Sequence, residues 1–161
     1  QVLTKRPARM EKLLKGRLSD AAAAPHIWWG VTVENRKHGL PRIDALRRTG
    51  AAMKFLSIEP LIEDLGPIDL SGIDWVIVGG ESGPGARPLE PQWVTSIQQQ
   101  CQEKGIPFFF KQWGGVQKSR FGRELNGRTY SEFPKTAPRS PRASNDRRRA
   151  FALAQSELET M

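Results

Sequence analysis

Residues 74–90 read DWVIVGGESGPGARPLE, and this stretch decides the class of fold. It opens with a nearly continuous apolar run, which is typical of a strand buried on both faces. A loop follows that holds four glycines, a glutamate, a serine and an arginine. Residues 91–105 then place apolar side chains at helical spacing. A buried strand, a polar loop and a helix in this order indicate one βα unit of an α/β fold.

The same pattern recurs along the chain. Apolar runs predict strands in five places: residues 1–4, 26–33, 53–59, 74–80 and 106–113. Helical spacing predicts helices at residues 7–18, 42–49 and 91–105, whereas residues 60–73 are interrupted by proline and glycine. Buried strands separated by helices indicate about five parallel strands with crossover connections. Their spacing of roughly 20 to 30 residues matches one unit of a (β/α)₈ barrel, but five units are too few to close it.

Two architectures remain open, an open α/β sheet and a partial (β/α) TIM-like barrel. The chain begins with Gln1 inside an apolar, β-favouring run. A domain rarely starts in the middle of a strand, so we predict a fragment or a truncated copy. In the barrel alternative, the first three strands are missing.

Two phosphate-binding motifs fail in the glycine-rich loop. Gly80 and Gly85 have the spacing of a phosphate loop, but Ala86 and Arg87 stand where that loop needs lysine and a hydroxyl residue. A dinucleotide fingerprint runs directly into a helix, whereas Pro88 follows here and the glycine order differs. A binding loop at the carboxyl end of a barrel strand fits the sequence better.

All five predicted strands end in polar residues, which would meet at one edge of a parallel sheet. We predict a cofactor- or substrate-binding rim there, with no assigned catalytic residue and no metal site. Its members are Lys5, Glu34, Asn35, Glu59, Gly79, Gly80, Glu81, Ser82, Arg87, Lys111, Gln112 and Trp113. Such a set of carboxylates and cations suits a polar, partly charged ligand. The alternative is that strand ends simply return to solvent and that the paired charges neutralise each other.

The positive charge is concentrated near the C-terminus. Residues 116–149 hold ten Lys/Arg against three Asp/Glu, a net charge of +7 out of +8 for the whole chain. We predict a partial barrel over residues 1–115, a small hairpin with an Asn-Gly turn over 116–134, and a basic tail over 135–161 whose composition is typical of disorder. The tail offers weak nucleic-acid contact. The arginines that would make it are Arg139, Arg142, Arg147, Arg148 and Arg149.

Cysteine content and hydropathy limit the metal sites and the cellular locations that we expect for this protein. Cys101 is the only cysteine, so the chain holds no disulfide framework and no cysteine-based metal site, and its helical position predicts a core residue. His26 and His38 lack metal-ligand spacing. Because no apolar run approaches the roughly 20 residues of a membrane span, we expect a cytoplasmic protein without membrane partners.

Six consecutive blocks resemble a phage and prophage family: QVLTKRPARM, WWGVTVEN, MKFLSIEPLIEDLG, IDWVIVGGESGPGARPLEPQWV, PFFFKQWGG and LNGRTYSEFP. This is the phage gene-product thirty-seven/sixty-eight family, a domain of unknown function also described as three-Cys-motif proteins. The resemblance covers roughly residues 1 to 134. It implies a barrel like that of radical S-adenosylmethionine enzymes, in which an N-terminal three-cysteine motif holds a 4Fe-4S cluster.

The resemblance also sets the expected function. Because the cysteine motif is absent, the cluster and S-adenosylmethionine are implied only for full-length relatives, and we expect no cofactor in this chain and no redox activity from it alone. Glu81, Ser82 and Arg87 would face the methionine or ribose portion of the cofactor. A nucleic-acid-binding phage accessory protein, acting through the basic tail, is the alternative function. A prophage remnant without function is a third.

Overall fold

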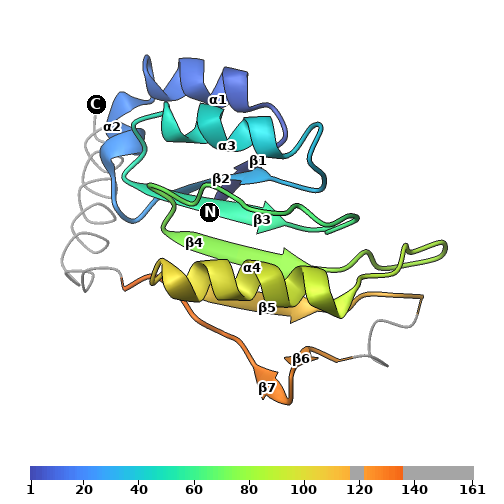
Figure 1. The fold of residues 1–161 in the computed structure, drawn as a ribbon. Helices are drawn as coiled ribbons and strands as arrows, with labels where there is room; N and C mark the ends of the chain where they lie inside the picture. The colour runs from blue at the N-terminus through green and yellow to red at the C-terminus, as the bar shows by residue number, and fades with distance from the viewer. Residues whose placement is uncertain (117–121, 136–161) are drawn as a thin grey trace, which may run out of the picture.

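The computed structural model describes residues 1–116 and 122–135 of the 161-residue chain. Five strands form one sheet in chain order, all parallel: β1 (Val2–Thr4), β2 (Trp28–Thr32), β3 (Met53–Ile58), β4 (Trp75–Gly79) and β5 (Phe108–Gln112). Helices lie in three of the four connections: α1 (Pro7–Leu14) and α2 (Ser19–Ala23) between β1 and β2, α3 (Leu40–Arg47) between β2 and β3, and α4 (Pro91–Glu103) between β4 and β5 (Figure 1). The predicted α/β class and parallel strands are confirmed.

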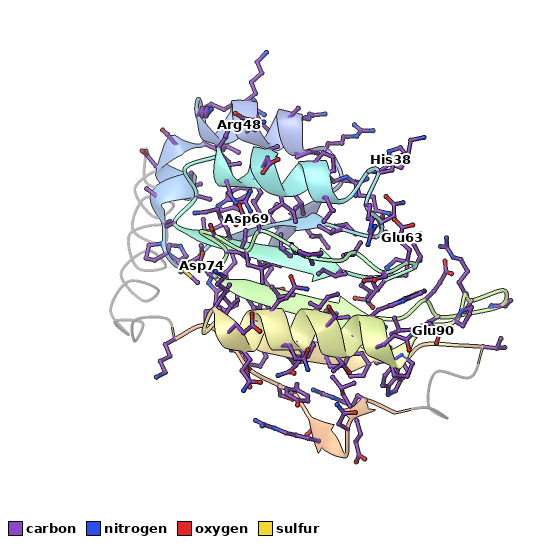
Figure 2. All side chains as sticks on the ribbon, in the orientation of Figure 1. His38, Arg48, Glu63, Asp69, Asp74 and Glu90 are labelled. Carbon is purple, nitrogen blue, oxygen red and sulfur yellow. The ribbon has the colours of Figure 1, made fainter. Side chains whose placement is uncertain are left out.

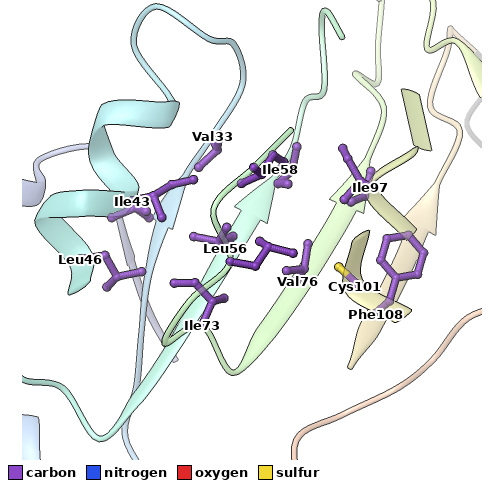
Figure 3. Packing of buried hydrophobic residues seen from close by; sticks show 14 of the residues in the cluster. Val33, Ile43, Leu46, Leu56, Ile58, Ile73, Val76, Ile97, Cys101 and Phe108 are labelled. Atoms are coloured by element: carbon purple, nitrogen blue, oxygen red, sulfur yellow. The ribbon is translucent and has the colours of Figure 1, made fainter. Parts of the chain in front are cut away.

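The helices pack on one face of the sheet. Alternate strand residues, among them Val31, Leu56 and Val76, share a single buried cluster with helix residues such as Leu46 and Ile97 (Figure 3). Doubly wound sheets reverse their strand order and so carry helices on both faces. A sheet whose order follows the chain keeps its crossovers on one face, because βα crossovers share one hand. The opposite face, called the inner face below, therefore carries no helix of this part of the chain.

Aromatic side chains line the inner face at the amino end of the strands. The Trp75 ring lies 5.4 Å from Trp28, 6.0 Å from Phe109 and 5.1 Å from Phe133, measured between centroids. Gly30 leaves room for Phe55, since a Cβ at that position would overlap the phenyl ring. Trp29 instead belongs to the helix-facing core, so the two adjacent tryptophans of β2 point to opposite faces, as the alternation predicts.

The first predicted helix was too long. A helix over residues 7–18 was expected, but α1 ends at Leu14 and a separate short helix, α2, begins at Ser19. The amides of Gly16 and Leu18 both donate to the Leu13 carbonyl, which closes the turn. Glycine destabilises a continuing helix by about 1 kcal/mol relative to alanine. The other two helices form where expected, and Gly50 and Gly105 follow them with positive φ.

The predicted hairpin forms beside β5. Strands β6 (Glu124–Leu125) and β7 (Arg128–Thr129) are antiparallel, and Asn126 and Gly127 both have positive φ, as a type I′ turn requires. Residues 130–132 then pair with β5 along its outer edge. The arginines of the predicted nucleic-acid contact lie outside the described residues. Within the described ranges, none of the helices is both long and apolar enough to cross a membrane.

Candidate functional site

A bulge in β5 places Gln112 on the inner face. Val78 pairs with Phe110 and Gly79 pairs with Gln112, so Lys111 is an extra residue opposite the β4 ladder. A bulge of this kind re-aims the side chain that follows it. The Gln112 side chain consequently lies on the inner face of the sheet beside Gly79, and not on the face that the helices cover. Carboxyl ends of parallel strands and bulges are both common places for binding sites.

Gln112, Glu59 and Lys111 form a cluster above Gly79. Gln112 Nε2 donates to Glu59 Oε1 at 2.6 Å and lies 3.3 Å from the Gly80 carbonyl, while Lys111 Nζ lies 3.0 Å from Glu59 Oε2. Both neighbours of Nε2 are acceptors, which sets the orientation of the amide. Gln112 is 5 % exposed, and its Oε1 has no hydrogen-bond partner in the described part of the chain. Buried hydrogen-bond acceptors without a donor are uncommon in proteins, so this oxygen is suited to accept a hydrogen bond from a ligand.

The glycine-rich loop packs against the end of β5 through its backbone. A Cβ on Gly80 would overlap the Trp113 carbonyl, and one on Gly114 would overlap the Glu81 carbonyl. Gly115 N donates to Glu81 O at 2.7 Å, and Gly80 N donates to Gln112 O at 2.9 Å. These glycines thus let the backbones of two neighbouring strand-end loops approach each other closely. Gly79 has a different role, since its missing side chain leaves room for the Glu59–Gln112 contact.

Glu81 and Arg87 form a bidentate pair that holds the loop closed. Arg87 Nε and Nη2 donate to the carboxylate at 2.7 and 2.8 Å, and the Arg87 amide donates at 3.0 Å. The side-chain hydrogen bonds from Arg87, followed by the one from its backbone, lower the pKa of Glu81 to about 2. Ser82 forms an isolated bridge with Gly115. The loop thus presents a paired carboxylate and not a free one.

Glu34 is held by two cations at the end of β2. Arg42 Nη1 lies 2.6 Å from Glu34 Oε2 and also donates to the Thr32 carbonyl, while Lys5 pairs with the other carboxylate oxygen. Burial raises the pKa of Glu34, but the hydrogen bonds from Lys5 and Arg42 outweigh burial and keep the pKa below its usual value. Asn35 has a local role, because its side chain accepts the His38 amide. The predicted rim is therefore divided into separate local groups, and the carboxylates of Glu34 and Glu81 are each satisfied within their own group.

Sequence reasoning missed three polar residues near this rim. Thr32 and Ser57 are register partners, each 5 % exposed, and strand alternation places both on the inner face. They stand two residues before Glu34 and Glu59 on the same strands. The signal was available, since each is the one hydroxyl in an apolar run. Arg42 could not be found this way, because it reaches the rim from α3.

The residues present do not fit an iron–sulfur cluster. Such a cluster needs several cysteine thiolates, whereas the single cysteine, Cys101, is fully buried in α4. Burial, with a smaller contribution from Glu132, raises its pKa to about 12, which disfavours the ligating thiolate. Among residues 1–116 and 122–135, no group of three or more His, Cys, Asp or Glu side chains could hold a metal ion.

His38 lies at the carboxyl end of the sheet with Glu63 and Glu90, whereas Asp74 lies at the opposite end (Figure 2).

These features define an α/β protein whose parallel sheet gathers paired polar side chains at the carboxyl ends of its strands. The model of a protein family described as Protein of unknown function (DUF5131) matches residues 1–134, and the chain belongs to that family. Comparison with curated proteins found no match, and comparison with solved structures found none either. The match covers every strand and helix described above.

Proposed function

We propose that this chain forms the C-terminal segment of a radical S-adenosylmethionine-like (β/α) barrel of the phage type, and that its inner rim binds S-adenosylmethionine. In this proposal the chain alone carries no redox centre. The sheet supports a barrel relationship, because its strands follow chain order and the helices of the described residues lie on one face. The ligand would lie on the inner face, at the carboxyl ends of the strands.

The unpaired Oε1 of Gln112 carries the proposal. It is a buried acceptor beside the Glu59 carboxylate and the Lys111 ammonium group. Together the three side chains offer acceptors and a cation within one cluster. S-adenosylmethionine brings hydroxyl and ammonium donors as well as a carboxylate, so its polar groups match those of the cluster. Thr32 and Ser57 extend the polar surface on the same face.

Calorimetric titration with S-adenosylhomocysteine, which keeps these polar groups and is chemically stable, tests the binding. We expect saturable binding with one site per chain. Glu59→Gln should weaken it about tenfold, since a hydrogen bond to a charged group contributes roughly 1.5 to 3 kcal/mol. Lys15→Gln, which changes an exposed ion pair on the far side of the sheet, is the matched control. Equal affinity for the wild-type chain and Glu59→Gln, or no binding at all, would refute the proposal.

Anaerobic reconstitution with iron and sulfide tests the expectation that this chain alone does not form an iron–sulfur cluster. We expect neither the broad visible absorption nor the paramagnetic signal of a four-iron cluster, because one buried cysteine cannot supply its ligands. A stable cluster on this chain alone would show that the proposal is wrong. Binding of S-adenosylhomocysteine is measured separately, so the two results are independent.

A second candidate function is weak nucleic-acid binding by the basic C-terminal part. The net charge of +7 in residues 116–149 favours it. Binding to a short DNA duplex should weaken steeply as salt rises, because phosphate contacts release counterions. Deletion of residues 136–161 should flatten that salt dependence. Unchanged binding after the deletion would exclude the tail as the contact.

A further inference from the structure

A hollow of about 450 Å³ opens on the helix-covered side of the sheet, next to the end of β5. Its walls come from the segment before α4, chiefly Arg87, Pro88 and Leu89, and from Trp113. Trp113 stacks edge-on against Phe110 with 4.7 Å between ring centroids, and both rings adjoin the helix-facing core. The hollow is therefore separate from the inner rim, where Glu59 and Gln112 lie.

Backbone contacts hold the walls in place. The segment that forms one wall of the hollow begins where the loop at Gly80 crosses the end of β5 at Trp113. A Cβ on Gly80, or on Gly114 in the other loop, would overlap the backbone of the opposite loop there. Gly83 N donates to Gly115 O at 3.2 Å, which adds a further hydrogen bond between the two loops. The Glu81–Arg87 pair then fixes the far end of the loop. A site that is already formed does not require its loops to be ordered when a ligand binds, which favours affinity.

The chemistry of the walls selects an aromatic ligand. Trp113 Nε1 already donates to the Glu124 carbonyl at 2.8 Å, so the indole offers its ring face and not a hydrogen bond. Pro88, Leu89 and Pro91 add apolar surface. A flat ring stacks on such a surface, and stacking contributes roughly 0.5 to 1.5 kcal/mol beyond area burial. The volume lies within the range of about 300 to 1,000 Å³ that small-molecule sites occupy.

Arg87 adds one polar requirement. Its Nε and Nη2 bind Glu81, and its Nη1 takes no part in that pair. A guanidinium has five N–H donors, so donors remain for an acceptor on the ligand. Because Glu81 neutralises the guanidinium, the site does not demand a strongly charged ligand. One carboxylate or carbonyl on the ring system is sufficient.

We propose that this hollow is a second binding site, for a planar aromatic molecule that carries one hydrogen-bond acceptor. The ring lies against Trp113 between the proline and leucine side chains, and the acceptor receives a hydrogen bond from Arg87. The site stands independently of the inner rim. Its occupation does not require S-adenosylmethionine.

The probe for this site is 2-naphthoate, followed by nuclear magnetic resonance of the indole N–H signals. The Trp113 signal is assigned by its loss in Trp113→Phe. We expect a saturable shift of that signal, and the same titration curve when S-adenosylhomocysteine is present at saturation. Decahydro-2-naphthoate has the same carboxylate on a saturated, non-planar ring system, and should bind about two- to tenfold more weakly because it cannot stack.

Arg87→Gln tests the polar contact, and because the side chain is 54 % exposed, we expect the variant to fold although its ion pair with Glu81 is lost. We expect about tenfold weaker 2-naphthoate binding, the usual effect of losing a hydrogen bond to a charged donor. Lys15→Gln removes an exposed cation of α1, away from both proposed sites, and should leave the affinity unchanged. No saturable Trp113 shift would overturn the proposal. So would equal affinity for the planar and saturated probes, or for the wild-type chain and Arg87→Gln.

Discussion

Gln112 reaches across Gly79 and donates a 2.6 Å hydrogen bond from Nε2 to the Glu59 carboxylate. The contact joins the ends of β3 and β5, which are not neighbours in the sheet. It exists because of the bulge at Lys111, which turns Gln112 toward the inner face, and because the residue between them has no side chain. These two local features thus build one polar cluster at the carboxyl end of the sheet.

Gln112→Glu should destabilise the protein at neutral pH. The substitution replaces the amide that donates to Glu59 by a second carboxylate, and two adjacent carboxylates repel when both are ionised. We expect a loss of about 2 kcal/mol in the free energy of unfolding at pH 7. The loss should shrink at pH 4, where the pair can share a proton. Urea unfolding at both pH values measures it, and an equal loss at both would contradict the electrostatic explanation.

Gly80→Ala should be more disruptive than an ordinary glycine substitution. The new Cβ would overlap the Trp113 carbonyl, which is backbone and cannot rotate away. We expect a destabilisation of about 1 to 3 kcal/mol, as overpacking usually causes. Gly16→Ala is the control, because its Cβ would lie 3.3 Å from the nearest backbone oxygen. Urea midpoints that fall equally in both variants would show that the loop crossing is not tight.

Glu81 should titrate far below an ordinary glutamate. Its pKa is lowered from 4.5 to about 2 by the side-chain hydrogen bonds from Arg87. The folded pKa is depressed, so the stabilisation from this pair is present above pH 4.5 and is lost as the pH falls toward 2. Carbon-13 resonance of the Glu81 carboxyl measures the pKa. Arg87→Gln should return it toward 4.5, and a wild-type value already near 4.5 would rule out the bidentate pair.

Cys101 should be unreactive in the folded protein. The side chain is fully buried, and burial raises its pKa to about 12, so the thiolate that reacts with disulfide reagents is scarce. We expect labelling by an aromatic disulfide reagent only under unfolding conditions, at a rate that follows unfolding. Rapid labelling in native buffer would show that α4 does not cover this residue.

Much of the fold could be predicted from the sequence because the strands are short apolar runs and the helices have clear apolar spacing. Residues 75–78 form a continuous apolar run, which is typical of a strand in a parallel sheet. The break after Leu14 was missed, since apolar spacing continues past Gly16 and outweighed a single glycine in the pattern.

The site could be predicted only in outline. Polar strand ends predicted that these side chains meet at one edge of the sheet, but not which of them pair there. Pairing depends on the bulge at Lys111 and on Arg42, which approaches from a helix. The role of Gly80 was also hidden, because the backbone that it contacts comes from Trp113, far along the chain. Contacts between distant segments leave no local pattern in the sequence.

The most direct test of the central claim is a titration of the isotope-labelled chain with S-adenosylhomocysteine, followed by backbone amide resonances. The proposed function predicts saturable shifts that concentrate on the inner rim, at Thr32, Ser57, Glu59, Lys111 and Gln112. The amides of α1 and of the β6–β7 hairpin should stay unchanged. Shifts confined to those distant elements, or no saturable shift at all, would contradict the claim that the inner rim binds this ligand.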